Sequence, residues 1–144
     1  MSTVVARLWT DHVVWMHEYV VAAVDQRNDA PEVAARLLRN PSDLGRAIEK
    51  ACGRKEGRRV AKLLHQHVIM AIDLIDAVCA EDEQRYREIE AVWESTDADE
   101  PWHRHIVLIK RMLAARLEDN FDADVAAFDE LLTLAADDAE RFAA

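Results

Sequence analysis

Apolar residues recur at alternating steps of three and four along most of the chain, the pattern of helices that bury one face. From about Thr3 to Gln26 the apolar stripe consists of Val5, Leu8, His12, Trp15, Tyr19 and Ala22. From about Lys55 onward it consists of Val60, Leu64, His67, Ala71, Leu74 and Val78. The pattern predicts two long amphipathic helices, and each carries a histidine at a position that should face the core.

A third helical pattern covers the stretch between these two, and a proline interrupts it. The pattern runs from Pro31 to Cys52, but the ring of Pro41 clashes with the carbonyl four residues back. We therefore predict that this helix either kinks near Asn40 or restarts there with Asn40 as its cap. Gly53 should end the helix, because glycine readily takes the left-handed conformation found after a helix.

The second half of the chain predicts further helices. After Val78 the apolar content falls and then resumes, which indicates a bend or a short separate helix over about 82–93. A polar linker over 96–100 follows, and Pro101 then opens a helix whose stripe is His105, Ile109, Met112 and Arg116. The last helix runs from Asp122, and we expect its core face to hold Val125, Phe128, Leu132, Ala135, Ala139 and Phe142.

Composition supports an all-α domain. The chain has 144 residues, of which 51% are hydrophobic, and it has only three glycines and three prolines. This composition favours helices, and the length is enough for one buried core. We predict an all-α, up-and-down four-helix bundle with an additional helical segment, forming a single domain over residues 1–144. Gly45 and Gly57 lie inside helical patterns and predict close packing between helices.

The charge of the chain excludes some partners and suggests another. A formal net charge of -10 argues against nucleic acid, because binding to phosphates depends largely on Lys and Arg. Acidic residues dominate 118–144, whereas basic residues dominate 36–62. These regions are either solvated faces or surfaces that pair two subunits, and we expect a homodimer through a helical face. With no long apolar run and no basic leader, we expect a cytoplasmic protein that does not bind membranes.

The sequence contains no motif typical of a catalytic site. It lacks a glycine-rich phosphate loop and a serine in a nucleophile elbow. Cys52 and Cys79 should lie at opposite ends of an antiparallel helix pair, too far apart for a disulfide, so we predict two free thiols. We therefore expect a binding protein that is non-catalytic or only weakly catalytic.

Three histidines on the apolar stripes are the strongest indication of function. A buried imidazole without a partner costs about 1 to 3 kcal/mol, so these residues must find partners inside the bundle. At 1.5 Å per residue, His12, His67 and the region of Asn40 lie at about mid-height of the bundle. His105 joins them only if the preceding segment folds back along the bundle.

Such a layer would suit a transition metal. Neutral imidazoles together with an amide or carboxylate oxygen can bind zinc, iron, copper or nickel. The candidate ligands are His12, His67, His105, Asp43 and Asn40. The two His-x-His pairs are not chelating motifs on a helix, because residues two apart point in nearly opposite directions. His65 and His103, together with His17, are therefore predicted at the surface or its boundary.

Two alternatives stay open at this point. The histidines could form a buried network that hydrogen-bonds to Asn40, Asp43, Tyr19 or backbone carbonyls and only sets helix register. The protein would then be a structural or interaction module whose charged faces bind a second copy or a partner. The other alternative is an enzyme that uses a metal-bound water. A di-iron site is not expected, because only Glu100 to His103 has the required Glu-x-x-His spacing.

Three motifs of the chain read LWTDHVVW (8–15), LLRNPSDLGRAI (37–48) and LLHQHVIMA (63–71). They resemble the motifs LWxxHVxW, LLxNxxDIGxAI and LLxxHIxxA of a largely uncharacterised bacterial family of small helical-bundle proteins. The resemblance implies a helical bundle whose recurrent polar positions are His12, Asn40, Asp43, His67 and His105. Two positions depart from the family pattern: Pro41 replaces a non-proline, and Leu132 stands where relatives carry a histidine.

Overall fold

The computed structural model of the chain describes residues 3–96 and 101–142, and within these ranges it contains only α-helices and their connections. The helices are α1 (Thr3–Val24), α2 (Ala30–Leu37), α3 (Asn40–Cys52), α4 (Arg54–Cys79), α5 (Glu83–Glu94), α6 (Pro101–Leu117) and α7 (Phe121–Arg141). The all-α prediction is confirmed. The arrangement as four main helices with one extra segment is not confirmed in detail, because the described residues form seven helices. None of these is both long and apolar enough to cross a membrane.

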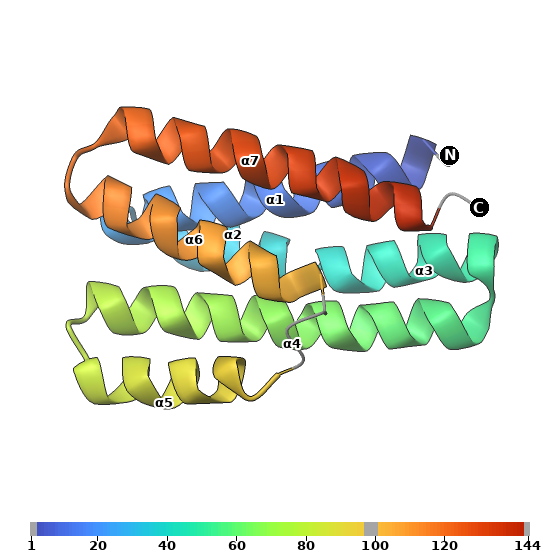
Figure 1. Cartoon of the computed structure of the whole chain (residues 1–144), viewed down its shortest axis with the longest axis horizontal. Helices are drawn as coiled ribbons and strands as arrows, with labels where there is room; N and C mark the ends of the chain where they lie inside the picture. Colours follow the sequence, from blue (N-terminus) through green and yellow to red (C-terminus); the bar gives the residue numbers. More distant parts are fainter. Residues whose placement is uncertain (1–2, 97–100, 143–144) are drawn as a thin grey trace.

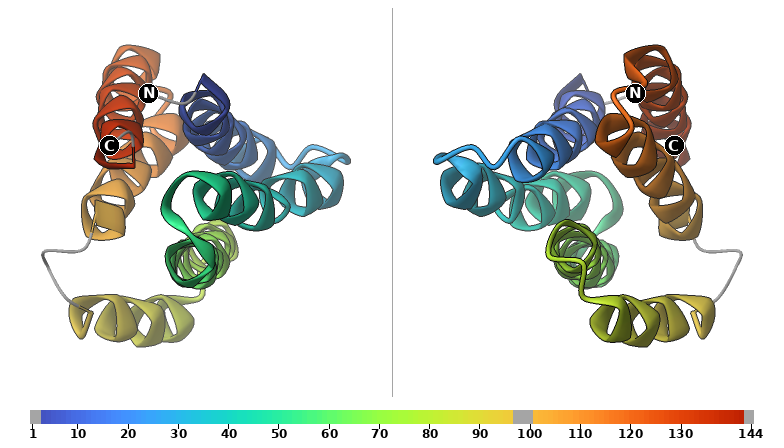
Figure 2. Two further views of the ribbon diagram at one scale, coloured as in Figure 1. Left: turned by 90° about the vertical axis from the view of Figure 1, so that its right-hand side faces the viewer. Right: turned by 90° about the vertical axis from the view of Figure 1, so that its left-hand side faces the viewer.

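Helix α1 is the central element of the fold. It packs against α2, α3, α4, α6 and α7, and its buried face includes Val5, Leu8, Trp9, Val13 and Met16. Two antiparallel hairpins, α3 with α4 and α6 with α7, lie on different sides of it (Figure 1). Helix α5 lies on the outside of the molecule against α4, as the end views show (Figure 2).

The predicted interruption at Pro41 is a full break between two helices. Helix α2 ends at Leu37, and α3 begins at Asn40. The expected cap is wrong, because no side chain caps the start of α3. Instead, the Asn40 side chain is fully buried, and its Oδ1 accepts a 2.9 Å hydrogen bond from the Arg36 guanidinium. This bond bridges the break and ties the two helices together.

Two glycines allow α3 and α4 to approach closely, as predicted. A Cβ atom on Gly57 would lie 2.6 Å from the carbonyl oxygen of Gly45, and one on Gly45 would lie 2.6 Å from the Cβ of Ala61. The turn between the helices is made at Gly53, whose φ of 93° lies in the region that favours glycine. Side chains larger than hydrogen at positions 45 and 57 would push the helices apart.

The predicted core face of the last helix is correct at Ala135 and Ala139 but shifted by one position in the first half of the helix. Val125 is 57% exposed, whereas the buried face of α7 consists of Asp124, Ala127, Leu131, Leu134, Ala135, Asp138 and Ala139. This face can be buried because each of its two aspartates contacts a histidine, Asp124 with His17 and Asp138 with His105. The sequence pattern favoured the neighbouring stripe, which is more apolar, and therefore did not predict that the two aspartates are buried.

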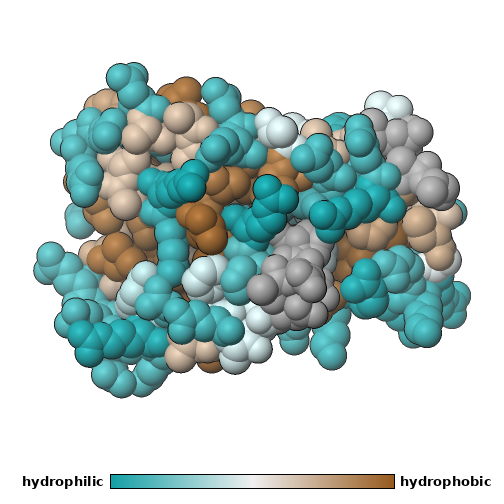
Figure 3. Space-filling view, viewed as in Figure 1, coloured by the Kyte–Doolittle hydropathy of each residue, from teal (hydrophilic) through white to brown (hydrophobic). Residues whose placement is uncertain are grey.

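On the face that carries α6 and α7, apolar side chains are visible between hydrophilic ones (Figure 3). The two cysteines are free, as predicted. Cys52 ends α3 and is exposed, while Cys79 ends α4 at the far end of that helix and is partly buried.

Candidate metal centre

Three histidines from three helices meet in the core. His12 comes from α1, His67 from α4 and His105 from α6, and they are 0%, 3% and 1% exposed. Their ring centroids form a nearly equilateral triangle with sides of 5.5, 5.6 and 5.9 Å. One nitrogen from each ring lies within 4.8 Å of the other two. The predicted histidine layer therefore exists as a compact cluster, which we call the histidine cluster.

His105 reaches this cluster because the chain folds back before α6. Helix α5 runs back along α4, and α6 begins beside the middle of α4 rather than at the end of the bundle (Figure 1). The sequence places His105 in the layer only if the segment before its helix folds back along the bundle, and α5 does so. The first turns of α6 therefore lie at the height of His12 and His67.

Most of the ring nitrogens in the histidine cluster lack hydrogen-bond partners among the described residues. Both nitrogens of His12, both of His67 and the Nδ1 of His105 are buried without a partner. A buried polar atom without a partner costs about 1 to 3 kcal/mol, so five such atoms in one place are a substantial unfavourable term. The cluster is therefore poorly explained by the needs of packing.

One nitrogen of the cluster is held by a carboxylate. The Nε2 of His105 lies 2.8 Å from Oδ2 of Asp138, and both side chains are 1% exposed. When Nε2–H donates to this carboxylate, the lone pair of His105 is on Nδ1, the nitrogen that has no partner in the described structure. Asp138 is in turn 3.8 Å from the Arg141 guanidinium, which offsets part of the cost of burying its charge.

Burial keeps two of the rings neutral. The loss of hydration is the main cause that lowers the pKa of His12 to about 3, and the charge of His105 adds to it. The pKa of His67 is lowered well below its usual value, first by burial and then by His105 and His12. At neutral pH both imidazoles therefore carry a free lone pair, the form that binds a metal.

Aromatic rings close one side of the histidine cluster. The Trp9 ring is fully buried and lies 6.1 Å from the ring of His12 and 6.2 Å from that of His105. Its indole stacks on Trp102 at 5.7 Å and on Phe142 at 6.4 Å. These apolar surroundings exclude water from the cluster, which strengthens electrostatic interactions inside it.

The other two predicted ligands lie differently. The Asp43 carboxylate is partly exposed and pairs with Arg46 on the same helix. It does not belong to the group of side chains close enough together to hold one ion. Asn40 is buried at the start of α3, where its Oδ1 is bonded to Arg36 and its Nδ2 has no partner in the described structure. The observed partners of both side-chain oxygens are therefore arginines outside the histidine cluster.

The remaining histidines lie outside the cluster, as predicted. His65 is exposed and His103 is partly buried. His17 is partly buried at the boundary of the core, where its Nε2 lies 3.0 and 3.1 Å from the two oxygens of Asp124 and its ring stacks on Phe128 at 4.4 Å. The inward and outward members of each His-x-His pair are therefore assigned correctly.

Asp138 is the site residue that sequence reasoning missed. A signal was present, because positions 124, 127, 131, 134 and 138 repeat at steps of three and four. Placing the stripe on this set would have put two aspartates opposite histidines on the core face.

Comparison with known proteins does not identify the chain. No family model matches the sequence, and no detectable similarity to a curated protein or a solved structure was found. The resemblance to a bacterial helical-bundle family therefore stays a prediction, and the function must be argued from the site itself.

Proposed function

We propose that this protein binds one transition-metal ion, zinc, iron, copper or nickel, through the imidazoles of His12, His67 and His105. The observation that carries the proposal is the meeting of three buried imidazoles from three helices, with one nitrogen of each within 4.8 Å of the other two. Five of the six ring nitrogens have no partner in the described structure. A metal ion would satisfy one nitrogen of each ring at once. The hydrogen bonds among the described side chains leave most of these nitrogens unsatisfied.

The geometry is close to that of a three-histidine site. A tetrahedral zinc ion with bonds of about 2.0 to 2.1 Å holds its ligand nitrogens about 3.3 Å apart. The three nitrogens already lie within 4.8 Å of one another, so small changes in side-chain torsion would close the remaining distance. Three protein ligands leave a fourth position for water or a small ligand, as in open metal sites.

Asp138 gives the site the partner that metal-binding histidines usually have. Histidine ligands typically donate their second ring N–H to a carboxylate or carbonyl, which fixes the tautomer and makes the ligand more basic. The hydrogen bond between His105 and Asp138 has this form. It holds His105 with Nδ1 as the ligand atom.

The alternative of a network that only sets helix register has less support. It requires hydrogen bonds from the histidines to Asn40, Asp43, Tyr19 or backbone carbonyls. In the described structure Asn40 bonds to Arg36, Asp43 pairs with Arg46, and the Tyr19 hydroxyl donates to Asp76. Among the described residues the one hydrogen bond to the cluster is that of Asp138, which leaves the other nitrogens available to a metal.

Titration with cobalt(II) tests this proposal, because tetrahedral cobalt absorbs strongly in the visible range. We expect the metal-free protein to develop such bands up to one equivalent and zinc to bleach them. His67→Ala should lose the bands, whereas His65→Ala, a change at the exposed histidine two residues away, should keep them. Absence of tetrahedral absorption in the folded wild-type protein would contradict the proposal.

A further inference from the structure

A largely apolar pocket lies next to the histidine cluster, between α4, α5 and α6. It has a volume of about 370 Å³, within the range of small-molecule sites, about 300 to 1,000 Å³. Its walls include Leu63, His67, Met70, Trp93, Trp102 and His103. We call it the α4–α5–α6 pocket.

The walls of this pocket define what could fill it. Four of its nine lining residues carry aromatic rings, and none is Lys, Arg, Asp or Glu. Polar groups come from Gln66, Thr96 and His103, and the Thr96 hydroxyl lies 3.4 Å from Nδ1 of His103. An ion would find no charged partner among these described lining residues, so its desolvation here would be costly. A neutral, flat molecule with one or two hydrogen-bonding groups fits these walls best.

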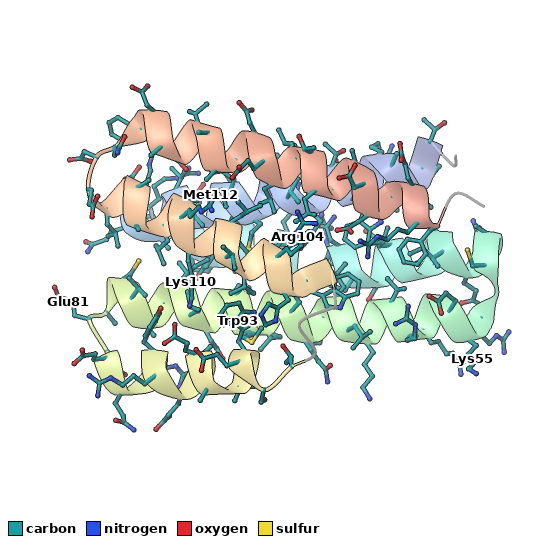
Figure 4. The ribbon with its side chains drawn as sticks, in the orientation of Figure 1. Lys55, Glu81, Trp93, Arg104, Lys110 and Met112 are labelled. Atoms are coloured by element: carbon teal, nitrogen blue, oxygen red, sulfur yellow. The ribbon has the colours of Figure 1, made fainter. Side chains whose placement is uncertain are left out.

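Contacts between α5 and α6 hold the aromatic wall in place. Trp93 points from α5 toward α6 (Figure 4), where its ring stacks on His103 at 4.4 Å. The ammonium group of Lys110 lies 4.5 Å from the centre of the same ring and pairs with Glu90 of α5. The aromatic wall is therefore largely formed before a ligand arrives, which reduces the entropy lost on binding.

His67 belongs to both the pocket and the histidine cluster. His67 lines the pocket, while both of its ring nitrogens are buried, with less than 1 Å² of exposed surface each, and one of them lies within 4.8 Å of a nitrogen of His12 and of His105. A molecule in the pocket would therefore pack against His67 without taking up its metal-binding nitrogens. Fixing the His67 ring with a metal also fixes part of the pocket wall.

We propose that the α4–α5–α6 pocket binds a small, neutral, planar aromatic molecule, and that His67 couples its binding to that of the metal. The pocket stands on its own geometry, whereas the coupling rests on the proposed metal site. Because an ordered wall binds a rigid ligand better, the metal should tighten aromatic binding, and the aromatic molecule should tighten metal binding by the same factor.

The first test uses 2-naphthol as the probe. Ligand-observed NMR measures its binding to the metal-free protein. Its saturated analogue, decahydro-2-naphthol, and its charged analogue, 2-naphthoate, serve as comparison ligands. We expect saturable binding of 2-naphthol and about tenfold weaker binding of both analogues, through lost aromatic contacts and uncompensated charge. Equal binding of all three, or none of 2-naphthol, would overturn the proposed ligand class.

Two tryptophan substitutions locate the binding site. Val92 lines the pocket and is 60% exposed, so Val92→Trp should fill the pocket mouth without disturbing the core. Val125→Trp, at a position 57% exposed on α7, is the matched control. We expect Val92→Trp to abolish probe binding and Val125→Trp to leave it unchanged. The same affinity in both variants would place the probe elsewhere and overturn the site.

Zinc(II) then separates the two proposals. We expect saturating zinc to tighten 2-naphthol binding by about fivefold or more, and His67→Ala to remove this difference. If zinc binds but leaves probe affinity unchanged, the coupling is wrong and the metal site stands. If the probe binds while no metal does, the metal site and the coupling are both wrong, and only the aromatic pocket is upheld.

Discussion

The Nε2 of His105 and the Oδ2 of Asp138 lie 2.8 Å apart, and both side chains are almost completely excluded from solvent. The two residues are 33 positions apart in sequence and lie on the antiparallel helices α6 and α7. A carboxylate in this position orients the imidazole and leaves its other nitrogen directed to the histidine cluster. The contact thus links the packing of the last two helices to the chemistry of the proposed site.

Asp138→Asn should weaken metal binding without removing a direct ligand. The amide keeps the size of the side chain but loses the charge that holds and polarises His105. We expect a loss of about 10- to 100-fold in metal affinity, measured by competition with a chelating dye. Asp137→Asn, at the exposed neighbouring position, is the control and should have wild-type affinity. Equal affinities for both variants would show that the carboxylate does not tune the site.

His67→Leu should keep or raise the stability of the metal-free protein. The leucine removes two buried nitrogens that have no partner in the described structure, each of which costs about 1 to 3 kcal/mol. The same variant should gain nothing from zinc, whereas the wild type should unfold at a higher temperature with zinc than with chelator. Thermal unfolding of both proteins, with zinc and with chelator, measures these differences. A clear loss of stability in the metal-free variant would indicate that His67 makes favourable contacts of its own.

The metal-free protein should become less stable as the pH falls below 6.5. Burial lowers the pKa of His12 to about 3 and that of His67 well below its usual value. In the unfolded chain both residues titrate near 6.5, so below this pH the unfolded state takes up protons that the folded state does not. Each histidine should then remove about 1.4 kcal/mol of stability per pH unit as the pH falls below 6.5, for His12 down toward pH 3, and neither should matter above pH 6.5.

This pH dependence can be separated from that of the carboxylates by comparing two proteins. Urea unfolding of the wild type and of a His12→Leu, His67→Leu double variant between pH 7.5 and 4.5 gives two free-energy curves. Their difference should grow as the pH falls, since only the wild type contains the two buried histidines. Parallel curves would mean that these residues do not titrate differently in the folded and unfolded states.

Gly57→Ala should destabilise the protein although alanine favours helix. The added methyl would lie 2.6 Å from the Gly45 carbonyl oxygen and 2.7 Å from the Cβ of Glu49, so α3 and α4 would have to move apart. We expect a net loss of about 1 to 2 kcal/mol, because overpacking outweighs the gain in helix propensity. Arg58→Ala, at the exposed next position, should change stability little. Urea unfolding checks both, and a stabilised Gly57→Ala would show that the helices separate easily.

The sequence was enough to find the histidine cluster but not its carboxylate partner. His12 and His67 were predictable because each sits on a long and unambiguous apolar stripe. His105 depended on the path of α5, which doubles back along α4, and composition does not determine that path. Asp138 was missed because α7 has two adjacent faces rich in apolar residues, and the choice between them is made by tertiary contacts with α1 and α6.

Asp43 and Asn40, the other two predicted ligands, have partners outside the histidine cluster in the described structure. Both residues stand at the height of the cluster when residues are counted along the helices. Height does not fix the direction of a short side chain near a helix start, however, and charged partners nearby decide it. Arg36, near the end of α2, bonds to Asn40, and Arg46, on the same helix as Asp43, pairs with that carboxylate in the described structure.

Metal content per chain is the measurement that tests the central claim most directly. The untagged protein, purified without chelator and, if needed, reconstituted with zinc, iron, copper or nickel, should contain close to one transition-metal ion per chain by elemental analysis. His67→Ala should lose the metal, and His65→Ala should retain it. A folded wild-type protein that holds no metal after reconstitution with all four ions would contradict the account.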